Sequence, residues 1–305
     1  MKNFWKGKGV LVTGSMGFLG KNLVYTLKKL KAKVEKFDIK YTFFQDTRNI
    51  EYVKTWVGNS KIEIIFHLAA EAFVGKCLNT PKLTFDTNIM GTWNVLESAR
   101  NNQKVKAIVI ASSDKAYGDN ILPYRETLPL LGVNTYDVSK SCADMIANCY
   151  IKTYNMPIGI TRCGNIYGPY DTNPSRLVPA IMHSIIKKEQ LKLRSNGECK
   201  RDFVYVDDIV DGYIKLAEKV YKGEFVGAMN LGNEKPIRIL DLVFDAYEVA
   251  KAKAKFKVED SKEAKNYEIQ EQWLDTRLAR SELGWKPKYS LKEGLKLTYK
   301  WWRGK

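Results

Sequence analysis

One turn constrains the fold of this chain more than any other feature: Thr13-Gly14-Ser15-Met16-Gly17-Phe18-Leu19-Gly20. It follows the apolar residues 10–12, which predict a buried strand, and it opens an amphipathic segment that predicts a helix. In a dinucleotide-binding turn, Gly14 would allow the tight bend, Gly17 would let the backbone approach a pyrophosphate, and Gly20 would permit close helix–strand packing. The N–H groups of the helix N-terminus would bind the phosphates. The turn therefore predicts a dinucleotide site.

Apolar strands alternate with amphipathic helices through the first half of the chain, which is typical of a doubly wound parallel sheet. Beyond residue 168 the alternation loosens. We therefore expect an α/β fold, with a Rossmann-type domain in residues 1–168 and a smaller α/β substrate-binding lobe in residues 169–305, and with 201–218 as a candidate to pack back onto the first domain. The expected strands are 10–12, 33–38, 62–68, 105–112, 158–162, 191–194 and 203–206, and the expected helices are 18–30, 49–57, 81–100, 136–155 and 177–188.

The net charge of +16 restricts the classes of partner. Such a charge suits a nucleic acid, a membrane surface or an anionic small ligand. The lysines are scattered and do not alternate with aromatic residues along one platform, which favours a solvated basic surface. We therefore expect neither a nucleic acid nor a membrane as partner, and the field also suits a substrate that carries a diphosphate.

The chain shows no signal for secretion, membrane insertion or metal binding. The first residues lack the apolar stretch of a signal peptide, and no apolar run reaches the roughly 18 residues that a membrane helix needs. The five cysteines are odd in number and have no C-x-x-C spacing, so neither a disulfide framework nor a zinc site is expected. We expect a cytoplasmic protein without a metal site.

Asp38 ends the second expected strand, downstream of the glycine turn. A carboxylate at this position can accept hydrogen bonds from the ribose hydroxyls of NAD and would repel the 2′-phosphate of NADP. The pattern therefore predicts NAD as the cofactor. The alternative is that Asp38 only caps a turn.

Tyr136 and Lys140 stand four residues apart, so they share one face of the expected helix. A lysine ammonium beside the tyrosine would lower the pKa of the phenol and let it transfer a proton. This pair also follows a strand that ends in Ser112-Ser113, at the edge where α/β sheets bind ligands. Two other Tyr-Lys pairs have the same spacing, and we assign them to helix surfaces: Tyr25/Lys29 and Tyr247/Lys251.

The strand end continues into Asp114 and Lys115, which adds a carboxylate and an amine to the serine hydroxyl. Ser113 would hydrogen-bond the reacting oxygen, while Asp114 and Lys115 would act as acid and base on neighbouring carbons. The alternative is a turn in which Ser and Asp bind the backbone. We interpret His67 and His183 as packed or locally hydrogen-bonded residues.

As a collinear set, the motifs resemble extended short-chain dehydrogenase/reductases that act on nucleotide sugars, and among them CDP-glucose 4,6-dehydratases most closely. The motifs are the glycine turn, the H-L-A-A segment at 67–70, residues 84–92, the Ser113/Tyr136/Lys140 set with Ser-Asp-Lys at 113–115, R-L-V-P at 176–179, R-D-F-V-Y-V-D-D at 201–208 and L-G-W-K-P at 283–287.

The resemblance implies further site residues. Asp46 and Thr47 would face the adenine, Leu68, Ala69 and Ala70 the pyrophosphate, and Asn88 would help to order the active site. The other residues expected at the cofactor are Gly14, Met16, Gly17, Phe18, Leu19, Asp38, Ala111, Ser112, Tyr136 and Lys140. Those expected at the sugar nucleotide are Glu71, Asn165, Arg176, Leu177, Val178, Leu193, Arg201 and Asn230, with Arg201 suited to the diphosphate.

The implied reaction is an internal redox cycle that converts an NDP-hexose into a 4-keto-6-deoxy sugar. Tyr136 would take the O4 proton, Lys115 the C5 proton, and Asp114 would protonate the departing hydroxyl. A 4-epimerase or a decarboxylase of the same family is the enzymatic alternative, and a cofactor-bound regulator or RNA-binding relative is the other. The resemblance also implies a homodimer, in which helices 81–100 and 136–155 form a four-helix bundle.

Overall fold

The structure, a computed structural model, describes residues 2–59, 61–193, 195–258 and 269–305. Within these residues, six parallel strands form one sheet in the order β2-β1-β3-β4-β5-β9. The order reverses between β1 and β3, and α/β sheets bind their ligands beside the carboxyl ends of strands at such a switch point. The strands are β1 Gly9–Thr13, β2 Lys33–Phe37, β3 Ile64–His67, β4 Ala107–Ala111, β5 Ile158–Cys163 and β9 Gly227–Leu231. The expected Rossmann-type sheet is confirmed.

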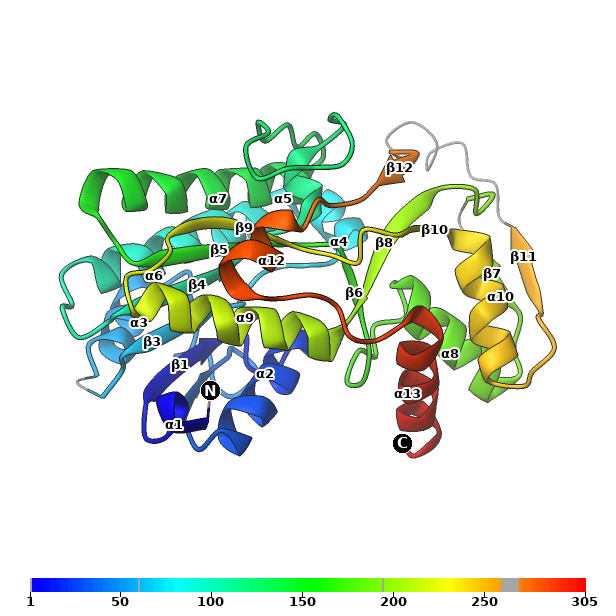
Figure 1. Ribbon diagram of the computed structural model, residues 1–305, viewed down its shortest axis with the longest axis horizontal. Helices are drawn as coiled ribbons and strands as arrows, with labels where there is room; N and C mark the ends of the chain where they lie inside the picture. Colours follow the sequence, from blue (N-terminus) through cyan, green and yellow to red (C-terminus); the bar gives the residue numbers. More distant parts are fainter. Residues whose placement is uncertain (1, 60, 194, 259–268) are drawn as a thin grey trace.

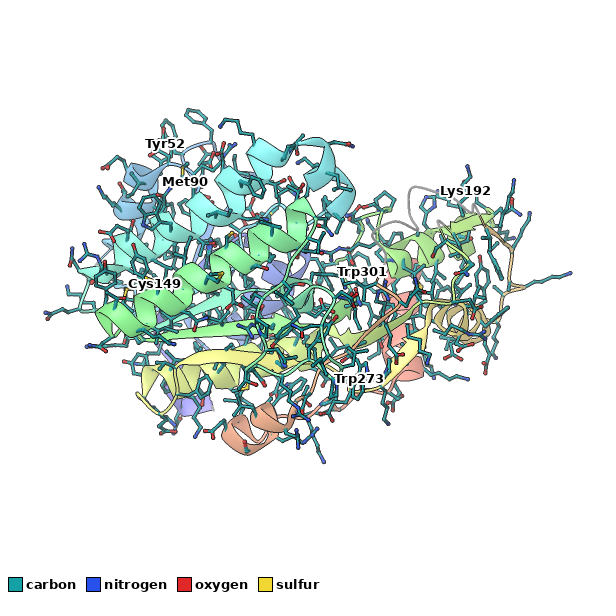
Figure 2. The ribbon with its side chains drawn as sticks, turned by 90° about the horizontal axis from the view of Figure 1, so that it is seen from above. Tyr52, Met90, Cys149, Lys192, Trp273 and Trp301 are labelled. Carbon is teal, nitrogen blue, oxygen red and sulfur yellow. The ribbon has the colours of Figure 1, made fainter. Side chains whose placement is uncertain are left out.

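Helices cover both faces of this sheet because its strands are apolar on both sides. In β1, Val10 and Val12 pack into the core beneath α1, α2 and α9, whereas Leu11 packs into the core beneath α3, α6 and α7 (Figure 1). On the second face α6 and α7 lie side by side (Figure 2). The helical segments of this domain are α1 Lys2–Trp5, α2 Phe18–Lys29, α3 Ile50–Val57, α4 Val74–Asn79, α5 Pro81–Phe85, the π-helical turn η1 Asp86–Met90, α6 Gly91–Arg100, the 3₁₀ turn η2 Asp114–Tyr117, α7 Thr135–Tyr154, α9 Val206–Tyr221 and α12 Arg277–Leu283.

A smaller lobe extends from the carboxyl side of the sheet (Figure 1). Within the described residues, β8 pairs with β6, β10 and β12, and β7 pairs with β11. Its elements are β6 Asn165–Tyr167, α8 Leu177–Lys187, β7 Leu191–Leu193, β8 Lys200–Tyr205, β10 Pro236–Arg238, α10 Ile239–Val249, β11 Phe256–Val258, β12 Glu271–Gln272 and α13 Leu291–Arg303.

The expected domain boundary at residue 168 needs a correction. The chain returns to the first domain after β8, because α9 packs on β4, β5 and α2 and β9 extends the main sheet beyond β5. The candidate segment 201–218 therefore contributes its helical part to the first domain. The strand expected at 191–194 is present as β7 up to Leu193, and its last residue, Arg194, lies outside the described residues.

Candidate active site

The glycine turn joins β1 to α2 in a conformation that other residues would not fit. Gly14 has φ of +68°, and a Cβ there would lie 2.7 Å from the amide nitrogen of Ala69. A Cβ at Gly20 would lie 2.2 Å from the carbonyl oxygen of Gly14. The turn therefore brings the start of α2 close to the end of β1, as predicted for Gly20, and brings Gly14 against the segment that follows β3.

Asp38 connects this turn to the end of β2. Its Oδ2 accepts a hydrogen bond from the Met16 amide at 2.8 Å, and its Oδ1 accepts one from the Lys40 amide at 2.9 Å. The carboxylate is buried, with 8% of the residue exposed. Asp38 thus caps the turn, as the alternative interpretation expected. A contact of Asp38 with a ribose stays a prediction.

His67 has a structural role at the end of β3. Its Nδ1 lies 2.8 Å from Thr13 Oγ1 and its Nε2 lies 3.0 Å from Thr92 Oγ1. Burial, together with the charge of Lys140, lowers the pKa of His67 to about 3, so the ring is neutral. The prediction of a locally hydrogen-bonded histidine is confirmed. The same Thr13 hydroxyl accepts the amides of Leu68 and Ala69, which fixes the segment that follows β3.

Tyr136 and Lys140 lie in the first turns of α7, opposite the end of β4. The helix begins here because Asn134 Oδ1 accepts the amides of Tyr136 and Asp137. Lys140 donates to the carbonyl oxygen of Ala111 at 2.8 Å, and burial lowers its pKa to about 8. Ser113 forms a hydrogen bond with the Tyr136 side chain.

The protonation of Tyr136 differs from the expectation. Burial raises the pKa of Tyr136 well above its usual range, although the charge of Arg176 and the Ser113 hydrogen bond lower it. In the protein alone the loss of solvent outweighs these opposing contributions. Tyr136 is therefore a neutral phenol near neutral pH. The expected lowering by Lys140, whose ammonium donates to a carbonyl of β4, stays a prediction.

Asp114 and Lys115 begin the 3₁₀ turn η2, directly after Ser113. Asp114 is buried, with 2% of the residue exposed, and its Oδ1 accepts the Ser113 hydroxyl at 3.0 Å. The Lys115 ammonium lies between Asp114 Oδ2 at 3.5 Å and Gln272 Oε1 at 2.6 Å. Gln272, on the short strand β12, was not predicted, because only the tertiary fold brings it to the site.

Asn88 links the site to the loop after β3. Its side chain donates to Ser139 Oγ at 2.8 Å and to the carbonyl of Glu71 at 2.9 Å, and it accepts the Glu71 amide at 2.7 Å. Ser139 in turn donates to the carbonyl of Tyr136. These contacts agree with the ordering role expected of Asn88. The residue lies in the π-helical turn η1, inside the helix expected at 81–100.

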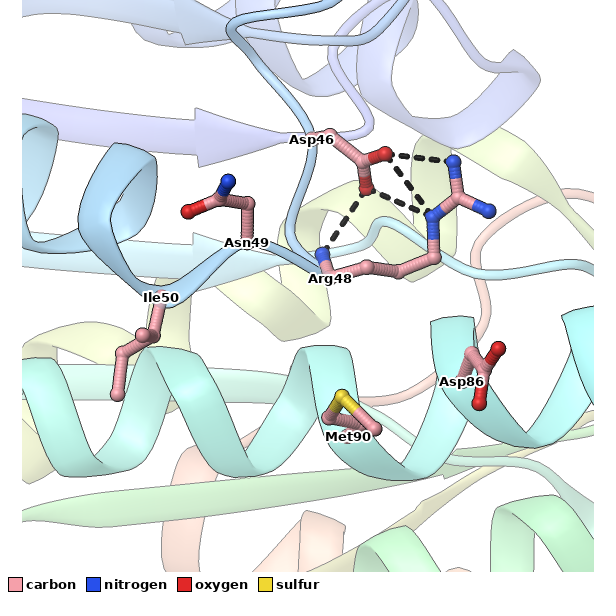
Figure 3. Close-up of a pocket in the computed structure, with 6 residues that line it drawn as sticks. All are labelled: Asp46, Arg48, Asn49, Ile50, Asp86 and Met90. Carbon is pink, nitrogen blue, oxygen red and sulfur yellow. Dashed lines mark hydrogen bonds and ion pairs between the residues drawn. The ribbon is translucent and has the colours of Figure 1, made fainter.

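The expected adenine residues lie beside a pocket near α3 and η1 (Figure 3). Arg48 donates to both carboxylate oxygens of Asp46, so this carboxylate is already engaged. Thr47 is buried, with 4% exposed, and its carbonyl accepts Asn94. The pocket is lined by Asp46, Arg48, Asn49, Ile50, Asp86 and Met90. A contact of Asp46 or Thr47 with adenine stays a prediction.

The expected sugar-nucleotide residues come from several elements. Arg176 lies near the site, since its charge acts on Tyr136 and its guanidinium lies 5.7 Å from the Phe18 ring centroid, at the start of α2. Leu177 is partly buried beside it at the start of α8. Asn165 donates to the carbonyl of Asp202, and Arg201 donates to the carbonyl of Lys200.

Three of these residues have buried side chains. Val178 and Leu193 belong to the hydrophobic core, because α8 and β7 pack their apolar faces inward. Asn230 is fully buried on β9 and is engaged by Tyr117, Tyr124 and Asp275. A contact of these three residues with a substrate stays a prediction.

The carboxyl edge of the sheet fits a dinucleotide cofactor. The glycine turn leaves a cradle that side chains would fill, and α2 begins there with no acidic residue in its first turn. Two buried hydroxyls at this edge, those of Ser15 and Ser112, have no hydrogen-bond partner among the described residues. Such groups are rare unless a ligand or water binds them. Within the described residues, no cluster of three or more His, Cys, Asp or Glu could hold a metal ion, and no helix could span a membrane.

Comparisons with known proteins agree with this geometry. A family model described as GDP-mannose 4,6 dehydratase matches residues 26–298. A CDP-glucose 4,6-dehydratase of Salmonella typhimurium is 29% identical over 98% of this chain and 92% of that protein. A UDP-glucuronate 4-epimerase of Thermodesulfobacterium geofontis is 29% identical over 95% of each chain. The structure of a UDP-glucose 4-epimerase of Thermus thermophilus complexed with NAD matches with a TM-score of 0.86 at 26% identity, over 97% of this chain and 99% of that one.

Proposed function

The chain belongs to the GDP-mannose 4,6 dehydratase family, and from this premise we propose that it is an NAD-dependent 4,6-dehydratase of a nucleotide sugar, with a CDP-glucose-like substrate preferred. One observation carries the proposal: Ser113, Asp114 and Lys115 meet Tyr136 at a single strand end. This set suits both halves of the reaction, oxidation at C4 and loss of water across C5 and C6. Bound NAD would take hydride from C4 and return it to C6.

Tyr136 is the proposed base of the first half. It removes the proton from the sugar O4, while Ser113 holds the same oxygen. Because the pKa of Tyr136 is raised, the phenolate must be favoured once the substrate is in place. The charge of Arg176 already lowers the pKa of Tyr136 in the protein alone.

Asp114 and Lys115 are the proposed groups of the second half. Since Lys115 sits as an ammonium beside the carboxylate, we propose that it first passes a proton to Asp114, 3.5 Å away. The neutral amine then takes the C5 proton, which the new 4-ketone has acidified. The protonated Asp114 gives its proton to the C6 hydroxyl, which leaves as water. The pair has then regained its charges, an ammonium at Lys115 and a carboxylate at Asp114. When Lys115 goes on to protonate C5, it is left one proton short. The missing proton is the one that Tyr136 took from O4, and its return from Tyr136 to Lys115 through solvent closes the cycle.

The test is product analysis with purified protein and a panel of CDP-, dTDP-, GDP- and UDP-hexoses. We expect a product lighter by one water, formed fastest from a CDP-hexose. A product of unchanged mass with C4 inverted would replace the proposal by a 4-epimerase, the candidate that the similarity to the UDP-glucuronate 4-epimerase favours. Loss of carbon dioxide from a uronic acid would indicate a decarboxylase, and binding without turnover would indicate a regulator.

A further inference from the structure

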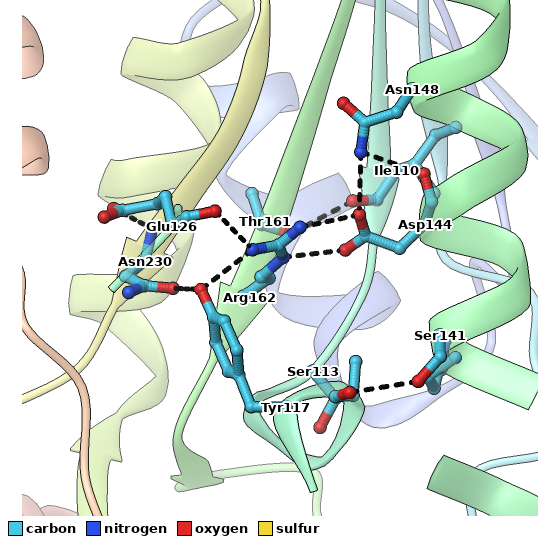
Figure 4. Close-up of polar contacts among 12 residues, drawn as sticks. Ile110, Ser113, Tyr117, Glu126, Ser141, Asp144, Asn148, Thr161, Arg162 and Asn230 are labelled. Atoms are coloured by element: carbon cyan, nitrogen blue, oxygen red, sulfur yellow. Dashed lines mark hydrogen bonds and ion pairs between the residues drawn. The ribbon is translucent and has the colours of Figure 1, made fainter. Parts of the chain in front are cut away.

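A buried network lies behind the candidate active site, between α7 and the strands β5 and β9 (Figure 4). Its centre is Arg162 on β5, with 3% of the residue exposed. The guanidinium donates from Nε and Nη2 to the two carboxylate oxygens of Asp144, each at 2.8 Å. Asp144 is fully buried on α7. This bidentate ion pair fixes the position of α7 relative to the sheet.

Tyr117, the last residue of η2, is attached to this ion pair. Arg162 Nη1 donates to its hydroxyl at 2.9 Å, and that hydroxyl donates to Asn230 Oδ1 at 2.8 Å. The guanidinium also lies 4.9 Å from the Tyr117 ring centroid. Tyr117 is fully buried, so its hydroxyl depends on these partners. The end of η2 is thereby held to both β5 and β9.

Two further contacts connect the same elements. Ser141, next to Lys140 on α7, donates to the carbonyl of Ala116 in η2 at 3.0 Å. Asn230 donates to the carbonyl of Asp275, shortly after the Gln272 that contacts Lys115. The network therefore reaches η2, which carries Asp114 and Lys115, and the segment directly after β12, the strand of Gln272.

We propose that Tyr117 is a positioning residue for the elimination step. Its hydroxyl holds η2 so that Asp114 and Lys115 face C6 and C5 of the sugar, next to the C4 at which Tyr136 acts. The inference rests on the dehydratase function proposed above. A four-residue 3₁₀ turn has poor hydrogen-bond geometry of its own, so its place depends on side-chain anchors. Asp114 and Lys115 begin the turn and Tyr117 ends it, which makes the anchor and the reactive groups one rigid unit.

The test is Tyr117→Phe, which keeps the ring and removes the anchoring hydroxyl. We expect kcat for water loss to fall, by up to about a hundredfold for a displacement near 1 Å, with KM little changed. Oxidation at C4 should survive, because Tyr136 is held on α7 by the Asn134 cap and Lys140 by the carbonyl of Ala111. On mixing with substrate, the near-ultraviolet absorbance of reduced nicotinamide should therefore accumulate, a signature that a general loss of stability would not produce.

Tyr247→Phe is the matched control, since Tyr247 is also buried and its hydroxyl lies 2.7 Å from Ser184 Oγ, in the smaller lobe. It should keep wild-type turnover and show no absorbance change. If Tyr117→Phe does not fold, Arg162→Lys, which keeps the charge opposite Asp144, should give the same signature.

A Tyr117→Phe variant with the kcat of an active wild type would overturn the inference, and so would a variant that loses C4 oxidation to the same extent as water loss. Failure of the wild type itself to release water from any nucleotide sugar would instead overturn the proposed function.

Discussion

At the scale of the residue, burial decides the protonation of the groups in the site. Tyr136 is held as a phenol and the pKa of Lys140 falls to about 8, although both would carry their ordinary values in solvent. Burial raises the pKa of Asp137, next to Tyr136, to about 7, although the charge of Lys115 lowers it. One of its carboxylate oxygens has no hydrogen-bond partner among the described residues. The loss of solvent outweighs neighbouring charges at all three positions.

The first prediction concerns Tyr136→Phe. The ring still packs beside Ser113 but can no longer exchange a proton, so turnover should fall by at least about a hundredfold. The variant should still bind NAD, because the glycine turn and Asp38 are unchanged. Steady-state rates and cofactor content after gel filtration measure the two effects. Tyr25→Phe, on the surface of α2, should change neither. Near-normal turnover of Tyr136→Phe would remove this residue from the mechanism.

The second prediction follows from the raised pKa of Asp137. Between about pH 4, its unfolded value, and about pH 7, the folded protein binds this proton more tightly than the unfolded chain does. The wild type therefore loses stability from this group as the pH rises through that window, by up to about 1.4 kcal/mol per pH unit. Asp137→Asn has no such loss. The free energy of unfolding of this variant minus that of the wild type should therefore increase up to about pH 7 and be constant above it.

Denaturant unfolding at a series of pH values measures this difference. Asp241→Asn is the control, because the hydrogen bond from Arg238 lowers the pKa of Asp241, and its titration falls below the window. Its difference from the wild type should be constant between about pH 4 and pH 7. A constant difference for Asp137→Asn as well would show that Asp137 does not titrate as described.

At the scale of the element, the join between β1 and α2 is the most restrictive packing of the site. The backbone of Gly14 lies where a Cβ of residue 20 would stand, and the end of β3 lies where a Cβ of residue 14 would stand. Strand, turn and helix therefore move as one unit, and the cofactor cradle exists only while they stay in contact.

The third prediction tests that contact with Gly20→Ala. The added Cβ, 2.2 Å from the Gly14 carbonyl oxygen, must push α2 away from β1. We expect the protein to lose roughly 1–3 kcal/mol of stability and to bind NAD more weakly, as measured by thermal unfolding with and without NAD. Gly75→Ala is the matched control, since a Cβ at this helical glycine meets nothing within 4 Å. Equal behaviour of the two variants would contradict the packing argument.

At the scale of the whole molecule, the helical face formed by α5, η1, α6 and α7 carries several large exposed apolar side chains. Figure 2 shows Met90 and Cys149 on this face, above the sheet. Large exposed side chains on these elements are Phe85, Met90, Trp93, Met145 and Tyr154. Contiguous apolar surface of this kind marks an interaction site. We propose that two copies of the chain pair here through a four-helix bundle, as expected from the sequence.

The fourth prediction is that Trp93→Glu and Met145→Lys, alone or together, convert a dimer into a monomer. Each places a charge where an apolar contact would be, with about half or more of the side chain exposed in the single chain (52% and 61%). Light scattering at micromolar concentration measures the mass. Tyr25→Glu, at a similarly exposed position on α2 (54%), should leave the dimer intact. A monomeric wild type would refute the pairing.

The parts of this protein whose signals are local could be predicted from the amino-acid sequence. The glycine turn, the strand periodicity and the Tyr136/Lys140 spacing identified the sheet, the cofactor edge and the Ser113–Lys115 strand end, because glycine geometry and i,i+4 faces depend only on residues close in the chain. His67 was likewise identified as a packed residue from its apolar neighbours.

The other features depend on burial and long-range contacts, which have no signature in a short window of sequence. α9 and β9 pack on the main sheet, so part of the second half of the chain belongs to the first domain. Gln272, more than 150 residues beyond Lys115 in the chain (|i−j| = 157), became its acceptor. Asn230, which the resemblance placed at the substrate, accepts a hydrogen bond from the hydroxyl of Tyr117. The phenol form of Tyr136 arose from its loss of solvent, which depends on everything packed around it.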